Sequence, residues 1–85
     1  MHEIFILTDH AQDRILEREI KQEWLLQALL NPDLKQPHER CLDREYVYKK
    51  IEENGGRVLK VVKSKEGIPF TIYTVHFDRG MKGKV

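Results

Sequence analysis

Cysteine is nearly absent from the sequence, since Cys41 is the only one among 85 residues. A disulfide within the chain, a zinc ribbon and a CxxC redox motif are therefore excluded. No stretch approaches the roughly 20 apolar residues of a membrane-spanning helix, and the early apolar run at 4–7 is too short for a secretory signal. The histidines lack metal-ligand spacing. We therefore expect a cytoplasmic protein without a membrane partner, a metal or another cofactor.

The sequence also lacks a substantial net charge, because 15 basic residues nearly balance 14 acidic ones and leave +1. This total gives no global argument for nucleic-acid binding. The distribution is uneven, however: residues 1–33 carry three basic and seven acidic residues, whereas residues 34–85 carry twelve and seven. The C-terminal part can therefore present a basic face that the total conceals.

Length and patterning predict one α+β domain over residues 1–85, because a chain this short has room for one core and its helices precede its strands. We expect two N-terminal helices packed on a curved antiparallel sheet of three to four strands, in the order (β)ααβββ. The expected elements are an edge strand at 4–7, helices over 9–19 and 21–31, a loop at 33–39, strands at 41–52, 57–64 and 69–77, and a terminal segment, 79–85, that frays.

Local signals place the ends of these elements. Thr8 and Asp9 are residues that favour helix N-caps, and Asn31-Pro32 ends the second helix because the residue before proline disfavours helical backbone. Glycine and asparagine predict turns at 54–56 and 65–67. Strict alternation in the last strand places Phe70, Ile72, Thr74 and His76 on one face and Thr71, Tyr73, Val75 and Phe77 on the other. Both faces then carry apolar side chains, which favours either a covered far face or a partner.

His10, Arg14 and Arg18 form one stripe on the first helix. Successive positions four apart rotate by about 40°, and the apolar residues Ala11 and Ile15 lie just beyond the stripe. The stripe therefore borders the buried face, where side chains are held by packing yet stay accessible to a ligand. Two guanidinium groups can bind a phosphate, and a histidine can transfer protons near neutral pH. This set suits cleavage of a phosphodiester. The alternative is a solvated helix face, in which Glu17 pairs with Arg14.

Three further positions on the predicted sheet can contribute to such a site. His76 alternates with Thr74 near the end of the last strand and can approach His10. Lys60 lies on the middle strand, and Lys49, Lys50, Lys63 and Lys65 lie in or beside the same two strands, where they can form a basic track. Tyr46 can stack on a base. Each has a structural alternative: a strand histidine bonded to a carbonyl, lysines that protect a sheet edge, and a half-buried tyrosine.

These residues carry a resemblance to a small-domain family known as domain of unknown function 4258. The similarity extends from about residue 9 to residue 77. Glu19 stands where the family often has glycine. The chain resembles the family in its opening pattern H-A-x-x-R-x-x-x-R-x-I (His10, Ala11, Arg14, Arg18 and Ile20), in the helix at 24–30 that ends at Asn31-Pro32, and in the strands at 59–62 and 71–75.

The resemblance implies a fold similar to RelE/ParE-type toxins and barnase-like ribonucleases, some of which cleave RNA and are inhibited by an antitoxin. One hypothesis is therefore a toxin-like ribonuclease with His10 and His76 as acid and base. Arg14 and Arg18 would stabilise the phosphate, and RNA and a small antitoxin protein would be the partners. The second hypothesis is a non-enzymatic interaction module that acts through its sheet face or as a homodimer. In a third, Arg14 and Arg18 pair with acidic residues of the sheet or of the loop at 33–39 and are structural. The family resemblance transfers no catalytic role to any residue.

Overall fold

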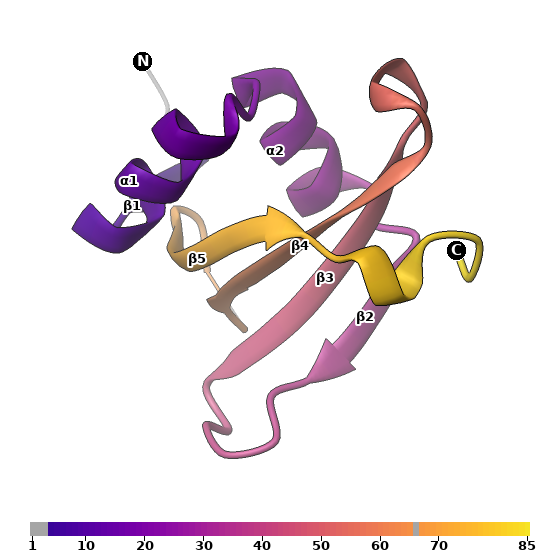
Figure 1. Ribbon diagram of the computed structural model, residues 1–85. Helices are drawn as coiled ribbons and strands as arrows, with labels where there is room; N and C mark the ends of the chain where they lie inside the picture. The colour runs from indigo at the N-terminus through magenta and orange to yellow at the C-terminus, as the bar shows by residue number, and fades with distance from the viewer. Residues whose placement is uncertain (1–3, 66) are drawn as a thin grey trace.

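Five strands form one mixed sheet in the order β1-β5-β4-β3-β2 in the computed structural model, which describes residues 4–65 and 67–85 (Figure 1). The four strands β2 to β5 pair antiparallel, whereas β1 runs parallel to β5. The predicted α+β class is confirmed. The expected count of three to four strands is wrong, and the sheet is not purely antiparallel. The strands are β1 (Phe5–Leu7), β2 (Leu34–Pro37), β3 (Arg44–Ile51), β4 (Arg57–Ser64) and β5 (Phe70–Phe77).

The unexpected strand, β2, lies within the segment 33–39 that the sequence predicts to be a loop. Its four residues pair antiparallel with β3, where Leu34 lies opposite Tyr48. Because β2 contains a lysine, a glutamine and a proline, it lacks the alternation of apolar and polar residues that indicates a strand. A charged residue and a proline are both typical of an edge strand. Asp33 fixes its start, because the carboxylate accepts a hydrogen bond from the backbone N–H of Lys50 at 2.9 Å.

The first helix, α1 (Asp9–Arg18), begins where the sequence predicts. The hydroxyl of Thr8 caps it by accepting from the N–H of Ala11 at 3.2 Å, and the same hydroxyl donates to the carbonyl of Tyr73 in β5 at 3.1 Å. One side chain thus starts the helix and fixes it to the sheet. The helix ends at Glu19, whose φ of 53° lies in the left-handed region that glycine favours. A glycine would adopt this conformation without the steric cost that a side chain adds.

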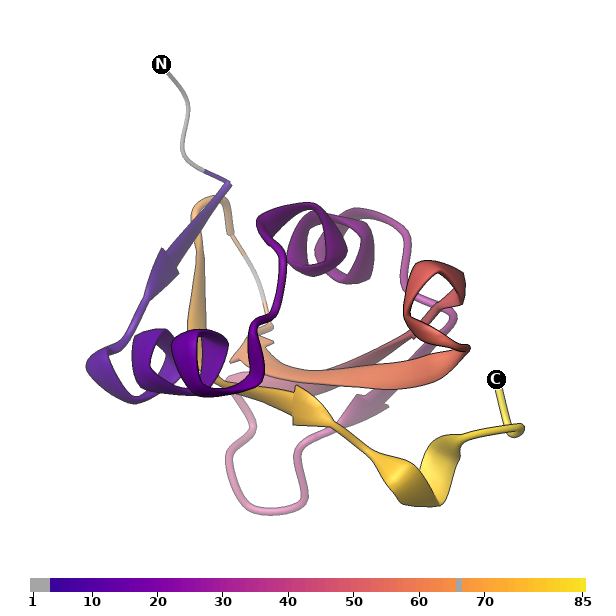
Figure 2. The same cartoon turned by 45° about the horizontal axis from the view of Figure 1, so that its top comes forward.

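The second helix, α2 (Gln22–Leu30), ends at Asn31 as expected and packs over β3 and β4, while α1 packs beside β5 (Figure 2). The ring of Trp24 meets the ring of Phe77 edge-on at 6.0 Å, and its indole N–H donates to Glu53 at 2.9 Å. The apolar core lies between the helices and one face of the sheet. It contains Ala11, Ile20, Trp24, Leu25, Ala28, Leu29, Val47, Ile51, Leu59, Val61, Ile72 and Val75.

A β-bulge interrupts the alternation of β5. Thr74 lies opposite Val62 and Ile72 opposite Lys63, so Tyr73 is an extra residue without a partner on β4. Ile72 and Val75 therefore both enter the core. The prediction that Ile72 shares a face with Thr74 and His76 is wrong for this reason. The apolar residues before and after the bulge therefore all pack on the face that the helices cover. The apolar side chains expected on both faces of the last strand no longer call for a partner protein.

The turns follow the glycine signals. The first hairpin turn contains a short 3₁₀ helix, η1 (Glu52–Asn54), followed by Gly55 and Gly56, both with positive φ. The second predicted turn, 65–67, includes Glu66, which lies outside the described residues. Within the segment expected to fray, η2 (Arg79–Met81) forms a 3₁₀ turn capped by the Asp78 carboxylate. Within the described ranges, no helix has the length and apolar character needed to cross a membrane.

The predicted basic track is wrong at Lys63, which is buried instead of exposed. Its side chain is 2% exposed, and its ammonium donates to Glu45 at 2.6 Å and to the carbonyl of Ser64 at 3.1 Å. It also lies 4.1 Å from the ring centroid of Phe70. Lys49 and Lys50 also have acidic partners, Asp33 and Glu52 respectively. These lysines therefore stabilise the sheet locally.

We expect Glu45→Gln to destabilise the protein by about 3 kcal/mol, because it leaves the buried ammonium of Lys63 without its counter-charge. The double variant Glu45→Gln, Lys63→Met should recover most of this loss, since it removes the buried charge as well. Urea unfolding followed by circular dichroism measures both. A loss below about 1 kcal/mol in the single variant would contradict the buried pair.

Candidate functional site

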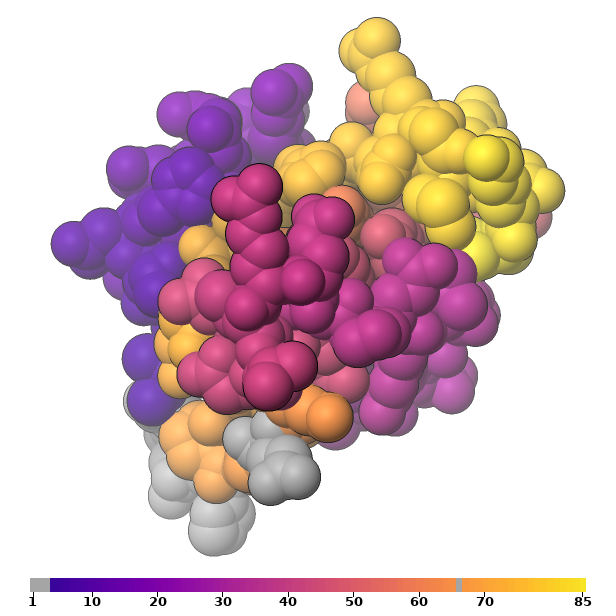
Figure 3. Space-filling model, turned by 90° about the horizontal axis from the view of Figure 1, so that it is seen from below, coloured from indigo at the N-terminus to yellow at the C-terminus, as the bar shows by residue number. Residues whose placement is uncertain are grey.

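The C-terminal half of β5 lies at an edge of the sheet that no strand covers within the described residues. β1 pairs only with residues 70–72 of β5, and beyond this point α1 runs beside the strand. In the space-filling view, β5 is set back between α1 and the C-terminal segment (Figure 3). The short length of β1 therefore opens a cleft between the helix and the sheet.

The cleft has a volume of about 500 Å³ and brings together residues from α1, the start of β4, the end of β5 and η2. Five of the seven predicted site residues line it, which places the polar stripe of α1 against the last strand. No carboxylate is among the lining side chains. The lining residues are His10, Arg14, Arg18, Arg57, Thr74, His76, Phe77 and Arg79.

The arginines give this cleft an excess of positive charge. Arg14 has an acidic partner, Glu17, at 3.0 Å, but both side chains are substantially exposed, so water screens the pair. Among the described residues, no salt bridge forms at Arg18, Arg57 or Arg79. Within the described residues, no salt bridge joins Arg14 or Arg18 to an acidic residue of the sheet or of the segment 33–39, and the pair of Arg14 with Glu17 is the one expected of a solvated helix face. Unpaired guanidinium groups that converge on a concave surface favour an anionic ligand.

Arg57, Phe77 and Arg79 were not predicted as site residues. The guanidinium of Arg57 lies 4.9 Å from the ring centroid of Phe77, because β4 and β5 pair in the register Leu59 opposite Phe77. Arg79 follows the end of β5 in η2. Only the strand register brings these residues beside α1. The one sequence signal was a basic residue directly after the glycine turn at 55–56.

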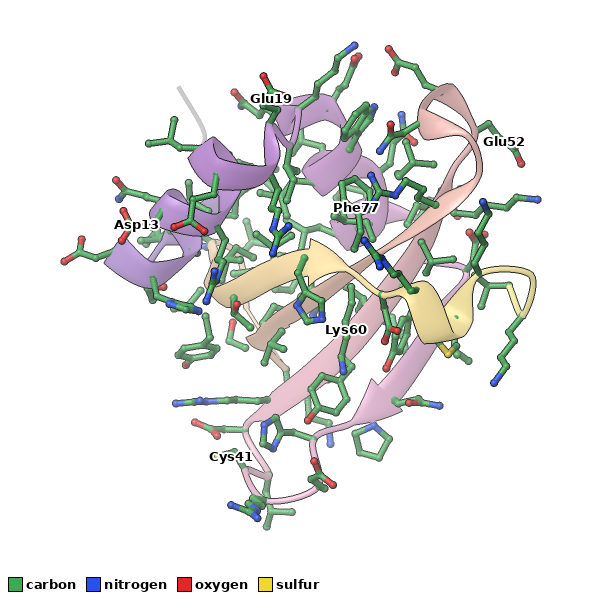
Figure 4. The ribbon with its side chains drawn as sticks, in the orientation of Figure 1. Asp13, Glu19, Cys41, Glu52, Lys60 and Phe77 are labelled. Atoms are coloured by element: carbon green, nitrogen blue, oxygen red, sulfur yellow. The ribbon has the colours of Figure 1, made fainter. Side chains whose placement is uncertain are left out.

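Lys60 and Tyr46, also predicted as binding residues, lie next to the cleft and not in its lining. Lys60 is opposite His76 across the strands, and Figure 4 shows it on the other side of β5 from Phe77. Its ammonium lies 4.3 Å from the ring centroid of Tyr46. The Tyr46 ring also packs against His38, with centroids 5.0 Å apart. Tyr46 therefore holds Lys60 in place, and its ring contacts leave it poorly placed to stack on a base.

His76 has a pKa below the ordinary histidine value. Burial is the main cause, because it disfavours the charged imidazolium. The positive charges of Lys60, Arg14 and Arg18 lower the pKa further, while Asp78 opposes them. His76 is therefore a neutral imidazole at pH 7, with a lone pair that can accept a proton. A bound anion would neutralise the neighbouring cations and raise this pKa.

A second hollow, of about 600 Å³, lies at Trp24 and the hairpin turn after β3. Its charges are already paired: Lys49 with Asp33, and Lys50 with Glu52. Glu53 also accepts hydrogen bonds from Lys21 and Trp24. In the described part of the chain, no three histidine, cysteine or acidic side chains form a group that could hold a metal ion. The cationic cleft is therefore the stronger candidate for a ligand site.

The fold and the cleft define a small α+β domain with a cationic, histidine-containing site. The chain belongs to the family described as domain of unknown function (DUF4258), whose model matches residues 7–77. The matched region contains both helices, the strands β2 to β5 and the last residue of β1, Leu7. It also contains seven of the eight cleft residues, all except Arg79. Comparison with curated proteins and with solved structures finds no match.

We expect the protein to lose stability faster than its His76→Gln variant as the pH falls through about 6.5. The unfolded chain protonates His76 in this range, whereas the folded state resists protonation because its pKa is lower, so protons favour unfolding. Above this range His76 is neutral in both the folded and the unfolded chain, so the difference in stability between the wild type and the variant is constant. Thermal melts of both proteins between about pH 8 and pH 5 measure it. Parallel curves would contradict the lowered pKa.

Proposed function

We propose that the protein is a toxin-like ribonuclease that binds RNA phosphate in the cationic cleft and cleaves RNA by metal-independent acid–base chemistry. The observation that carries this proposal is the convergence of two histidines and four arginines on one cleft without a lining carboxylate. Histidines supply proton transfer, and guanidinium groups bind phosphate oxygens in bidentate fashion. The set therefore contains the groups that cleavage of a phosphodiester requires.

The place of His76 in the cleft lining and its lowered pKa support a role for His76 as the general base. Neutral His76 accepts the proton of the ribose 2′-hydroxyl, whose oxygen attacks the adjacent phosphorus. Arg14 and Arg18 stabilise the negative charge that grows on the phosphorane. The P–O5′ bond breaks, and His10 donates a proton to the departing 5′ oxygen. The products are a 2′,3′-cyclic phosphate and a 5′-hydroxyl.

Residues around the cleft position these groups. Lys60 lies opposite His76 on the neighbouring strand and lowers its pKa, which keeps the base unprotonated. Thr74 shares the cleft lining and offers a hydroxyl to a phosphate oxygen. Tyr46 acts one step further away, because it supports Lys60 through its ring. We assign Lys60 and Tyr46 positioning roles.

The order of elements, with two helices followed by an antiparallel meander, supports a likeness to RelE/ParE-type toxins. On this proposal a small antitoxin protein covers the cleft and holds the activity in check. The absence of a lining carboxylate favours an acidic partner surface, because such a surface would neutralise the cleft. The near-neutral chain as a whole limits long-range attraction of RNA, so binding depends on the local charge of the cleft.

We expect His76→Ala and His10→Ala each to lower the rate of RNA cleavage by about a hundredfold or more, as is typical for loss of a general acid or base. Lys35→Ala is the control, since Lys35 is exposed on the edge strand β2 and lines no part of the cleft. Cleavage of a labelled RNA in a buffer with a chelator measures the rate. Equal rates for His76→Ala and the wild type, or a requirement for added metal, would contradict the mechanism.

The alternative proposal is a non-enzymatic interaction module. The outer edge of β1 favours it: within the described residues this edge pairs with no strand, and Ile6 in β1 and Leu16 in α1 are 48% and 77% exposed. An unpaired strand with apolar neighbours can extend the sheet into a second chain.

If this edge mediates a homodimer, light scattering should give twice the chain mass of 10.1 kDa, and Ile6→Lys should restore the monomer. Lys35→Glu, on the opposite edge strand β2, should leave the dimer intact. A monomer at all accessible concentrations would contradict the homodimer.

A further inference from the structure

A third, smaller hollow continues from the cationic cleft along the end of β5. It has a volume of about 290 Å³ and shares Arg57, Phe77 and Arg79 with the cleft. Val58, Asp78 and Lys82 complete its lining. A ligand that occupies the cleft can therefore extend into this hollow without leaving the protein surface.

The hollow differs from the cleft in its chemistry. The partly buried Phe77 provides the accessible apolar surface, because Val58 in the lining is almost fully buried. Arg57, Arg79 and Lys82 supply positive charge. The guanidinium of Arg57 already covers the Phe77 ring at 4.9 Å. Such a flat guanidinium surface beside an apolar wall is suited to stacking on an aromatic ligand. Inorganic phosphate would satisfy the cations and leave the apolar surface unused.

We propose that this hollow is a nucleobase subsite, so that the ligand of the cleft is single-stranded RNA, with one phosphate in the cleft and an adjacent base beside Arg57 and Phe77. This inference rests on the proposed function and names its substrate class. The apolar surface and stacking plane explain a base better than they explain an acidic peptide, whose carboxylates need only the cations.

The hollow favours single-stranded RNA over a duplex, because a side chain must reach the flat face of a base. In a duplex the bases are paired and stacked, and their flat faces are unavailable to a side chain. In a single strand an unstacked base can enter a hollow beside the backbone. Asp78 supports this ligand further: its Oδ1 accepts from the Gly80 N–H at 2.9 Å, while its second oxygen forms no hydrogen bond within the described part of the chain and can accept one from a base N–H.

The test compares two oligomers with the same phosphates. One is a fluorescent hexanucleotide of 2′-O-methyl RNA, which binds without being cleaved, and the other is the same oligomer without bases. We expect the oligomer with bases to bind roughly fivefold tighter or more, as one stacked base provides. Arg57→Lys keeps the charge but removes the stacking plane, so it should reduce this preference to less than twofold. Arg40→Lys, in the exposed loop before β3, is the matched control.

The outcomes separate the subsite from the proposed function. Equal affinity for both oligomers, with Arg18→Ala weakening each of them, would overturn the nucleobase subsite and leave the phosphate cleft intact. No measurable binding of either oligomer would overturn both. Displacement of the oligomer by poly-glutamate of equal length at the same concentration would overturn the RNA assignment in favour of an acidic protein segment. Retention of the preference in Arg57→Lys would place the base elsewhere.

Discussion

The β-bulge at Tyr73 is the constraint on which the candidate site depends. Ile72 points into the core, and with strict alternation Thr74 and His76 would point there as well. The extra residue reverses the pattern, so that Val75 enters the core and His76 faces the side where Lys60 lies. Bulges commonly redirect a side chain in this way next to functional sites. The backbone carbonyl of the bulged residue also accepts the hydrogen bond from Thr8, which links the bulge to the start of α1.

The position of α1 follows from this link and determines what the cleft contains. Because Thr8 is fixed to Tyr73, the helix begins where β1 ends and runs along the uncovered part of β5. His10, Arg14 and Arg18 then border the strand, while buried Ala11 anchors the helix in the core. Water and Glu17 reduce the repulsion between the gathered cations. Burial above all, and the positive charges of Lys60, Arg14 and Arg18, keep His76 unprotonated. The lowered pKa of His76 therefore makes the folded state sensitive to acid.

Sequence reasoning predicted most of the local structure and five of the eight residues that line the cleft. Thr8 and Asn31-Pro32 act through their immediate neighbours, so they placed the helix ends correctly. The helical repeat placed three cleft residues on one stripe. Sequence reasoning missed the strand β2, whose polar residues carry no alternation. It also missed the burial of Lys63, which depends on Glu45 on the neighbouring strand. Arg57 and Arg79 were missed because a strand register that spans some 20 residues brings them to the cleft.

The sequence by itself determined the helix stripe, the first hairpin turn and the α+β class, because these follow from caps, glycines and periodicities that act over a few residues. The tertiary structure alone decided which face His76 occupies, which lysines are buried and which arginines join the cleft. These depend on a bulge, on pairings between distant strands and on the short reach of β1. Such features arise when the whole core packs at once, and no local pattern encodes them.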